Sequence, residues 1–252
     1  MIAFHSDLDN TLIYSYKKEI GPKKKCVEHY QGREISFMTE ESYYLLREIS
    51  SRVMVIPTTT RTKEQYERIE LGIEIPKYAL VCNGGVLLEH GKSSKVWYQE
   101  SLEIISESKG ELNAAVKLLE QDEHRCFEIR LINELFVFTK SDRPQETISY
   151  LKTSLNTHVV DIFHNGSKIY VVPKKLTKGN AVKRLKKILN PEKIIAAGDS
   201  EFDISMFSEA DIAWMPKELS ERYLHRRGTT LVHDKKSMFS DMVLNYISEK
   251  LL

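Results

Sequence analysis

The chain has 252 residues, and Lys plus Arg (37) almost balances Asp plus Glu (36), which leaves a formal net charge of +1. This balance gives no electrostatic reason to expect a nucleic acid or a membrane surface as partner, and no apolar run approaches the ~20 residues of a membrane span. The amino terminus has no basic region before its apolar stretch, so it does not resemble a signal peptide. Three widely spaced cysteines without a CxxC pair predict reduced thiols in a cytoplasmic protein, and no zinc site: Cys26, Cys82 and Cys126.

The first part of the chain alternates predicted strands and helices. A short apolar strand at the start runs into the acidic sequence 7–11, and the polar segment 14–32 is typical of a hairpin or flap. We expect a helix over 39–50 with Thr39 as its N-cap, a strand over 53–56, a helix over 62–71 and a strand over 78–82. This order predicts a parallel sheet with helices on both faces.

The middle of the chain has a different pattern, in which a helix followed by two strands occurs twice. Helices are expected over 106–120 and 144–155, and strand pairs over 125–131 with 135–139 and over 159–163 with 167–172. Asn165-Gly166 between the last two strands is a strong hairpin signal. These elements predict a small α+β unit with an antiparallel sheet, inserted into the first domain.

The α/β alternation then resumes, with a helix over 181–189, a strand over 194–197, a helix over 204–209, a strand over 211–214 and a final helix over 236–251. The predicted fold class is therefore α/β: a Rossmann-like, doubly wound parallel sheet formed by residues 1–99 and 174–252, with a smaller α+β cap formed by residues 100–173.

Two carboxylates, Asp7 and Asp9, follow the first strand directly. Residues two apart in an extended chain point to the same side, and like charges that close are costly unless something positive lies beside them. A divalent metal would supply that positive partner, and a site for a metal and a phosphate would give the reason for the pair. A simple polar turn is the alternative.

Other predicted strands also end in polar residues. Thr59 follows the strand over 53–56, and Asp199 and Asp203 follow the strand over 194–197. Ligands of open α/β sheets bind beyond the carboxyl ends of the strands, and Lys178, just before a helix, can reach the same crevice. Carboxylates of this kind hold Mg²⁺, while a hydroxyl, a lysine and loop amides hold phosphoryl oxygens.

With these four motifs the chain resembles the haloacid dehalogenase-like phosphohydrolases. The first motif is Asp7-Leu8-Asp9-Asn10-Thr11, the second is Thr59 in a strand-end Thr-Thr-Thr-Arg, the third is Lys178 in Lys-Gly-Asn-Ala, and the fourth is the sequence from Gly198 to Asp203. The α+β insert and Asn83-Gly84-Gly85 before it look like the subgroup with the Cof-like, sucrose-phosphate and mannosyl-phosphoglycerate phosphatases. One position departs, because that subgroup usually has Asn where this chain has Phe202.

The resemblance implies a Mg²⁺-dependent phosphomonoester hydrolase with an aspartyl-phosphate intermediate. Asp7 would be the nucleophile and Asp9 the general acid and base, while Thr59 and Lys178 would orient the phosphoryl group. Asp203 would orient the metal shell or Lys178. The implied metal-site residues are Asp7, Asp9, Asp199 and Asp203; those implied to bind substrate or phosphate are Leu8, Asn10, Thr59, Thr60, Arg61, Asn83 and Lys178.

The substrate is expected to be a small phosphorylated metabolite of the sugar-phosphate type, and the protein a monomer or weak homodimer. Arg130, His164 and Lys168 of the cap are candidates for contacting the leaving group, although each is also typical of an ordinary surface residue. Arg61 contacts either the substrate or its own helix start. Two other functions stay open: a phosphomutase with the same aspartyl chemistry, and a phosphate-ligand sensor without turnover, which only Phe202 favours.

Overall fold

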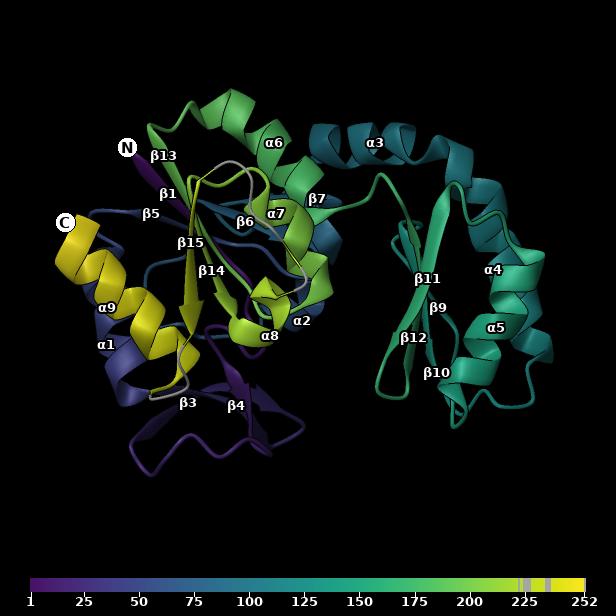
Figure 1. Cartoon of the computed structure of the whole chain (residues 1–252), viewed down its shortest axis with the longest axis horizontal. Coiled ribbons are helices and arrows are strands. Elements are labelled where there is room, and N and C mark those ends of the chain that lie inside the picture. The colour runs from purple at the N-terminus through teal and green to yellow at the C-terminus, as the bar shows by residue number, and fades with distance from the viewer. Residues whose placement is uncertain (222, 224–227, 234–236, 252) are drawn as a thin grey trace. The chain divides into compact units, whose positions relative to one another are not determined.

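The computed structural model describes residues 1–221, 223, 228–233 and 237–251, and it divides into two compact units (Figure 1). The first unit consists of Met1–Ser94 and Thr177–Leu252, and the second of Lys95–Leu176. Each unit has its own sheet and its own helices. Among the described residues, no helix combines the length and the apolar character that a membrane crossing requires.

The first unit is built on a five-stranded parallel sheet with the order β15-β14-β13-β1-β5. Strand β1 lies inside it, so that Phe4 pairs with Ile195 on one side and with Val55 on the other. Burial on both faces explains why the central strands are almost continuously apolar. The strands are β1 (Ile2–Ser6), β5 (Met54–Pro57), β13 (Lys193–Ala197), β14 (Ile212–Pro216) and β15 (Thr229–His233).

Helices cover both faces of this sheet (Figure 1). α1 (Glu40–Ile49) packs with α9 (Phe239–Leu251), and α6 (Lys178–Leu189) packs with α7 (Ile204–Phe207). Thr39 is the N-cap of α1, as predicted, and its hydroxyl accepts a hydrogen bond from the Ser42 amide at 3.0 Å. The Thr39 and Ser42 hydroxyls also donate to the buried carboxylate of Asp241 at the start of α9. These bonds join the two helices at one end.

Two small antiparallel sheets complete the first unit. The first, called the flap below, has the order β2-β4-β3 and consists of β2 (Tyr14–Ser15), β3 (Lys24–Tyr30) and β4 (Arg33–Thr39). The second has the order β6-β7-β8 and consists of β6 (Tyr78–Val81), β7 (Val86–Glu89) and β8 (Lys92–Ser93). The Thr59 amide donates to the Leu80 carbonyl at 2.8 Å, which ties β6 to the chain just after β5.

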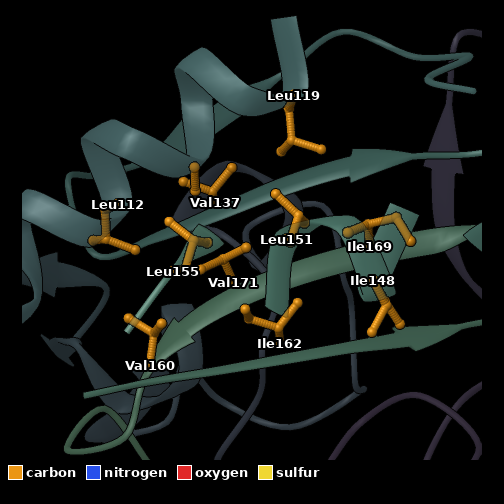
Figure 2. Packing of buried hydrophobic residues seen from close by; sticks show 11 residues of the cluster. Leu112, Leu119, Val137, Ile148, Leu151, Leu155, Val160, Ile162, Ile169 and Val171 are labelled. Atoms are coloured by element: carbon orange, nitrogen blue, oxygen red, sulfur yellow. The ribbon is translucent and has the colours of Figure 1, made fainter. Parts of the chain in front are cut away.

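The second unit has a four-stranded antiparallel sheet with the order β11-β12-β10-β9. Its strands are β9 (Arg130–Ile132), β10 (Phe136–Lys140), β11 (Val160–Asn165) and β12 (Lys168–Pro173), and its helices are α3 (Lys95–Ile104), α4 (Lys109–Gln121) and α5 (Pro144–Ser154). Figure 2 shows how Leu112 and Leu119 of α4 and Leu151 of α5 point toward Val137 and Val171 of the sheet. This cluster is the core of the unit.

The fold class is confirmed, since a parallel central sheet is combined with antiparallel sheets and helices. The largest difference concerns the helix predicted over 62–71, of which only α2 (Lys63–Tyr66) is α-helical. After α2 the chain pairs with the flap instead: the Glu70 amide donates to the Val27 carbonyl at 2.8 Å, and Glu28 bridges to Ile69. Tertiary pairing has replaced the helical hydrogen bonds that the local pattern favours.

Smaller differences concern elements that the sequence pattern did not indicate and the boundaries of other elements. α3, α8 (Lys217–Ser220) and β15 were not predicted, and β9 is shorter than the strand expected over 125–131. The β11–β12 hairpin is present, but Asn165 pairs with Lys168, so its two-residue turn is Gly166-Ser167, one residue later than expected. Gly166 has a positive φ of 57°, which glycine adopts without strain. The predicted start of the final helix, residue 236, lies outside the described residues.

Leu151 offers a test of the core in the second unit, because its side chain is fully buried in the cluster of Figure 2. Leu151→Ala is expected to lower the free energy of unfolding of this unit by about 2–5 kcal/mol, since it removes buried methyl groups and leaves a cavity. Urea denaturation measures the change. Val96→Ala on α3, where the side chain is 70% exposed, is the control and should change stability by less than about 0.5 kcal/mol. Equal effects of the two substitutions would contradict the packing described.

Candidate active site

The carboxyl ends of three neighbouring parallel strands bring the predicted motifs together. Ser6 at the end of β1 pairs with Pro57 of β5 and with Ala197 of β13. The next residue, Asp7, donates its amide to the Ala197 carbonyl at 2.9 Å. Asp7 therefore lies between the loops that carry Thr59 and Asp199, as expected from the position of ligand sites in open α/β sheets.

A buried ammonium group lies at the centre of this site. Lys178 is 1% exposed, and its Nζ lies 2.5 Å from Asp7 Oδ1 and 2.6 Å from Asp203 Oδ1. The helix α6 begins at Lys178, with Thr177 as N-cap accepting from the Asn180 amide. The cap fixes the start of the helix, and the start of the helix places the lysine. Motifs one, three and four thus meet in one ion-paired group.

Asp203 is held by more than the lysine. Its second oxygen, Oδ2, accepts hydrogen bonds from the Ser200 hydroxyl at 2.9 Å and from the amides of Ser200 and Asp199 at 3.0 and 3.1 Å. A Cβ at Gly198 would lie 2.3 Å from Asp203 Cγ, so only glycine allows this close approach. With both oxygens engaged, Asp203 is built to position Lys178 and the loop rather than to bind a ligand directly.

The site holds more negative than positive charge. Donor oxygens of Asp7, Asp199 and Asp203 all lie within 4.8 Å of one another, and Lys178 supplies one positive charge. Burial raises the pKa of Asp7 well above its ordinary value, against the attraction of Lys178. Burial and the Asp203 charge raise the pKa of Asp199 to about 7. Such shifts mark carboxyl groups that lack sufficient positive charge nearby.

An all-oxygen donor set with excess negative charge fits a hard divalent cation such as Mg²⁺. Asp7 and Asp199 are the carboxylates available as direct ligands, and the Asn10 side chain favours the ionised form of Asp199 and opposes the rise of its pKa. The Asp9 side chain, in contrast, does not join this group and contacts Arg61 instead. If Asp9 contributes to a metal site, its backbone carbonyl is the group available.

Arg61 and Asp9 form a two-pronged ion pair. Arg61 Nε and Nη2 donate to the two carboxylate oxygens of Asp9 at 2.8 and 2.7 Å. The third nitrogen, Nη1, lies 2.8 Å from Glu28 Oε2 in the flap. Arg61 therefore bridges the first motif and the flap, rather than pairing only with its own helix start.

Glu28 is a site residue that the sequence did not reveal. Its side chain is fully buried, and its carboxylate contacts Arg61, Arg68 Nη2 at 3.1 Å and the Ser36 hydroxyl at 2.6 Å. In a polar, lysine-rich segment an isolated glutamate has the pattern of a solvated side chain. The one signal in the sequence for a buried carboxylate was the pair of arginines at 61 and 68, because partly buried arginines need a carboxylate partner.

Thr59 and the neighbouring predicted residues line the same strand ends. Thr59 is fully buried, its hydroxyl accepts from the Arg61 amide at 3.1 Å, and its carbonyl accepts from the Asn83 amide at 3.0 Å. Asn83 has a positive φ of 58°. Leu8 is buried, so its side chain belongs to the core, and only its backbone is available to a phosphate; Thr60 follows Thr59 and is half-buried.

The remaining candidates have partners of their own. Arg130 pairs with Glu128, and His164 lies 2.9 Å from Gln145 Nε2 and 3.0 Å from the Gly166 carbonyl. Lys168 lies exposed at the start of β12. All three belong to the second unit, whereas Lys178 belongs to the first.

Comparison with known proteins agrees with this architecture. A model of the haloacid dehalogenase-like hydrolases matches residues 106–218. A phosphoglycolate phosphatase from Sulfurisphaera tokodaii is 29% identical over 178 residues, which cover 69% of this chain and 70% of that protein. The resemblance of the chain to the haloacid dehalogenase-like hydrolases is confirmed over residues 106–218. The predicted enzyme class of the chain, a phosphatase, is confirmed by these similarities.

Solved structures show the same fold as this chain. The sucrose-phosphatase of Synechocystis sp. PCC6803, in complex with sucrose and phosphate, superposes with a TM-score of 0.67 at 18% identity, covering 98% of this chain and 96% of that one. A subclass IIB sugar phosphatase gives a TM-score of 0.62 at 13% identity, covering 98% and 99%. The expected subgroup therefore has the same overall fold.

The charge balance at Lys178 predicts a pH-dependent loss of stability. Lys178→Met is expected to lower the free energy of unfolding by about 3–5 kcal/mol near pH 8, because Asp7 and Asp203 remain buried without their cation. Burial raises the pKa of Asp7, and loss of Lys178 raises it further. A pKa raised in the folded state favours folding at low pH, and this benefit is lost as pH rises. The destabilisation should therefore be smaller near pH 5.

Urea denaturation of the wild type and of Lys178→Met, in metal-free buffer near pH 8 and near pH 5, measures this loss of stability. Lys183→Met is the matched control, since Lys183 lies exposed on the same helix, and it should change stability by less than about 0.5 kcal/mol. The same loss for Lys178→Met at both pH values would contradict the charge balance described.

The buried carboxylate of Glu28 generates a second prediction. Glu28→Gln is expected to lower the free energy of unfolding by about 1–3 kcal/mol, because Arg61 and Arg68 lose their shared charged acceptor. Glu34→Gln, in the same sheet with a side chain 60% exposed, is the matched control and should be near neutral. Thermal and urea denaturation measure both. A neutral Glu28→Gln would show that the arginines do not depend on Glu28.

Proposed function

We propose that the protein is a Mg²⁺-dependent phosphomonoester hydrolase in which Asp7 forms an aspartyl-phosphate. The observation that carries the proposal is the group of Asp7, Lys178, Asp199 and Asp203, in which the buried ammonium contacts Asp7 and Asp203 and the oxygens of all three carboxylates lie within 4.8 Å of one another. A nucleophile at Asp7 therefore has one cation, Lys178, already in position. Mg²⁺ held by Asp7 and Asp199 would neutralise charge on the transferring group.

In the first half of the reaction, a carboxylate oxygen of Asp7 attacks phosphorus as the bond to the leaving oxygen breaks. Lys178 Nζ, already 2.5 Å from the attacking carboxylate of Asp7, stabilises the negative oxygens of the phosphoryl group. Thr59 and the loop amides orient the same oxygens. The leaving oxygen takes a proton from Asp9 and departs as an alcohol.

In the second half, water attacks the phosphorus of the aspartyl-phosphate and gives its proton to Asp9. The bond between phosphorus and the Asp7 oxygen breaks, which releases inorganic phosphate and restores the starting state. The role of Asp9 as general acid requires a change in its contacts. A carboxylate that accepts two hydrogen bonds from Arg61 is in its ionised form and has no proton to donate. The Asp9 side chain is 51% exposed, so it has room to leave Arg61. We propose that, when substrate binds, Asp9 leaves Arg61, takes up a proton from solvent and then donates it to the leaving oxygen.

The names of two relatives, a phosphoglycolate phosphatase and a sucrose-phosphatase, support a substrate class. We propose a small phosphorylated metabolite of the sugar-phosphate type. A screen of sugar phosphates, phosphoglycolate, phosphoglycerate esters and nucleotides, with and without Mg²⁺, measures release of inorganic phosphate. Isomerised sugar phosphate without free phosphate would indicate a phosphomutase, and binding without turnover would indicate a sensor.

The decisive substitution is Asp7→Asn, which keeps the shape of the side chain and removes the nucleophilic oxygen. It is expected to lower phosphate release from an aryl phosphate by about a thousandfold or more. Mass spectrometry of the acid-quenched wild type should show one phosphoryl group, and the variant none. Asp161→Asn, on an exposed position of β11, is the control and should retain full activity. Activity that survives Asp7→Asn would remove Asp7 as the nucleophile.

A further inference from the structure

Outside the candidate active site, three metal-ligating side chains meet on the flap: Cys26, His29 and Glu34. Cys26 Sγ lies 3.7 Å from His29 Nε2, and His29 Nε2 lies 3.9 Å from Glu34 Oε1. The three donor atoms all lie within 4.8 Å of one another. His29 and Glu34 are exposed and Cys26 is half-buried, so a small ion has access from solvent.

The backbone of the flap creates this group. Cys26 and His29 are three residues apart, so a regular strand would turn them to opposite faces. The register between β3 and β4 shifts twice, between Cys26 and Glu28 and again between Glu28 and His29. Such irregularities re-aim side chains, and here they leave Cys26 and His29 together while Glu28 between them is buried against Arg61.

The hairpin turn supplies the third donor. Gln31 and Gly32, with φ of 51° and 72°, form the two-residue connection between β3 and β4. This turn pairs Tyr30 with Arg33 and His29 with Glu34. Two positive φ values in a two-residue loop are the geometry that best fits the twist of the strands. The position of Glu34 opposite His29 is therefore set by the backbone rather than by a flexible loop.

The donor types point to zinc. Thiolate, imidazole and carboxylate are the three side-chain ligands of Zn²⁺ in proteins, whereas Mg²⁺ prefers oxygen alone. A tetrahedral ion with bonds of about 2.0–2.3 Å keeps its ligand atoms about 3.3–3.7 Å apart. The separations of 3.7 and 3.9 Å need to contract by only a few tenths of an ångström.

We propose that the flap carries a Zn²⁺ site formed by Cys26, His29 and Glu34, with water as the fourth ligand. When the bond from sulfur to the metal forms, the Cys26 thiol releases its proton to solvent, so binding strengthens as pH rises. The site differs in chemistry from the all-oxygen group of Asp7, Asp199 and Asp203, the other metal-ligating group among the described residues. It does not depend on the proposed phosphatase activity.

Co²⁺ titration of the reduced protein tests the proposal, because cobalt occupies zinc sites and a thiolate ligand adds a charge-transfer band in the near ultraviolet. The wild type should show this band with about one equivalent of Co²⁺ and lose it when Zn²⁺ is added. Cys26→Ser should abolish the band. His29→Gln and Glu34→Gln, at exposed positions, should each weaken binding by at least about tenfold.

Two control variants separate this site from other metal-binding groups. Cys126→Ser removes another exposed thiol, and Asp199→Asn disrupts the all-oxygen group; both should keep the band. A wild type without a thiolate band, or a band that survives Cys26→Ser, overturns the proposal. If Cys26→Ser does not fold, unchanged affinity in His29→Gln and Glu34→Gln overturns it equally.

Discussion

The first unit depends on a single buried cation, the ammonium of Lys178 between Asp7 and Asp203. Removing three charged groups from water costs several kcal/mol per ion, and only close pairing with further hydrogen bonds repays it. Both conditions are met, because Asp203 also accepts three hydrogen bonds from its own loop. The ion pairs of Lys178 with Asp7 and Asp203 connect α6 to the end of β1 and to the loop after β13, so one electrostatic constraint organises the strand ends.

The same constraint explains why the site suits phosphoryl transfer. One ammonium does not balance the carboxylates of Asp7, Asp199 and Asp203, and burial together with repulsion among these carboxylates raises the pKa of both Asp7 and Asp199. A divalent cation held by Asp7 and Asp199 would remove that deficit and would add positive charge for an anionic phosphoryl group. The charge deficit is therefore the physical basis of the proposed metal dependence, and it is a property of the folded chain alone.

The flap contributes to both proposed sites through one irregular strand. The register shifts in β3 bury Glu28 against Arg61, which in turn holds Asp9, and they bring Cys26 and His29 together on the accessible side. Two neighbouring register shifts thus give the polar residues Cys26, Glu28 and His29 two different tasks. This arrangement also explains the short α2, since the chain after it pairs with β3 instead of continuing as a helix.

The sequence by itself determined the strand ends, their order and the N-cap of α1, because apolar periodicity, polar strand termini and capping residues are local signals. Asp7, Thr59, Lys178 and Asp199 were found in this way, and parallel strands bring such ends to one edge. Only the tertiary structure decided that Glu28 is buried, that Asp9 pairs with Arg61 and that Cys26 lies beside His29 and Glu34. These contacts depend on shifts of strand register and on burial between distant segments. Neither produces a periodic pattern of residues that could be recognised in the sequence.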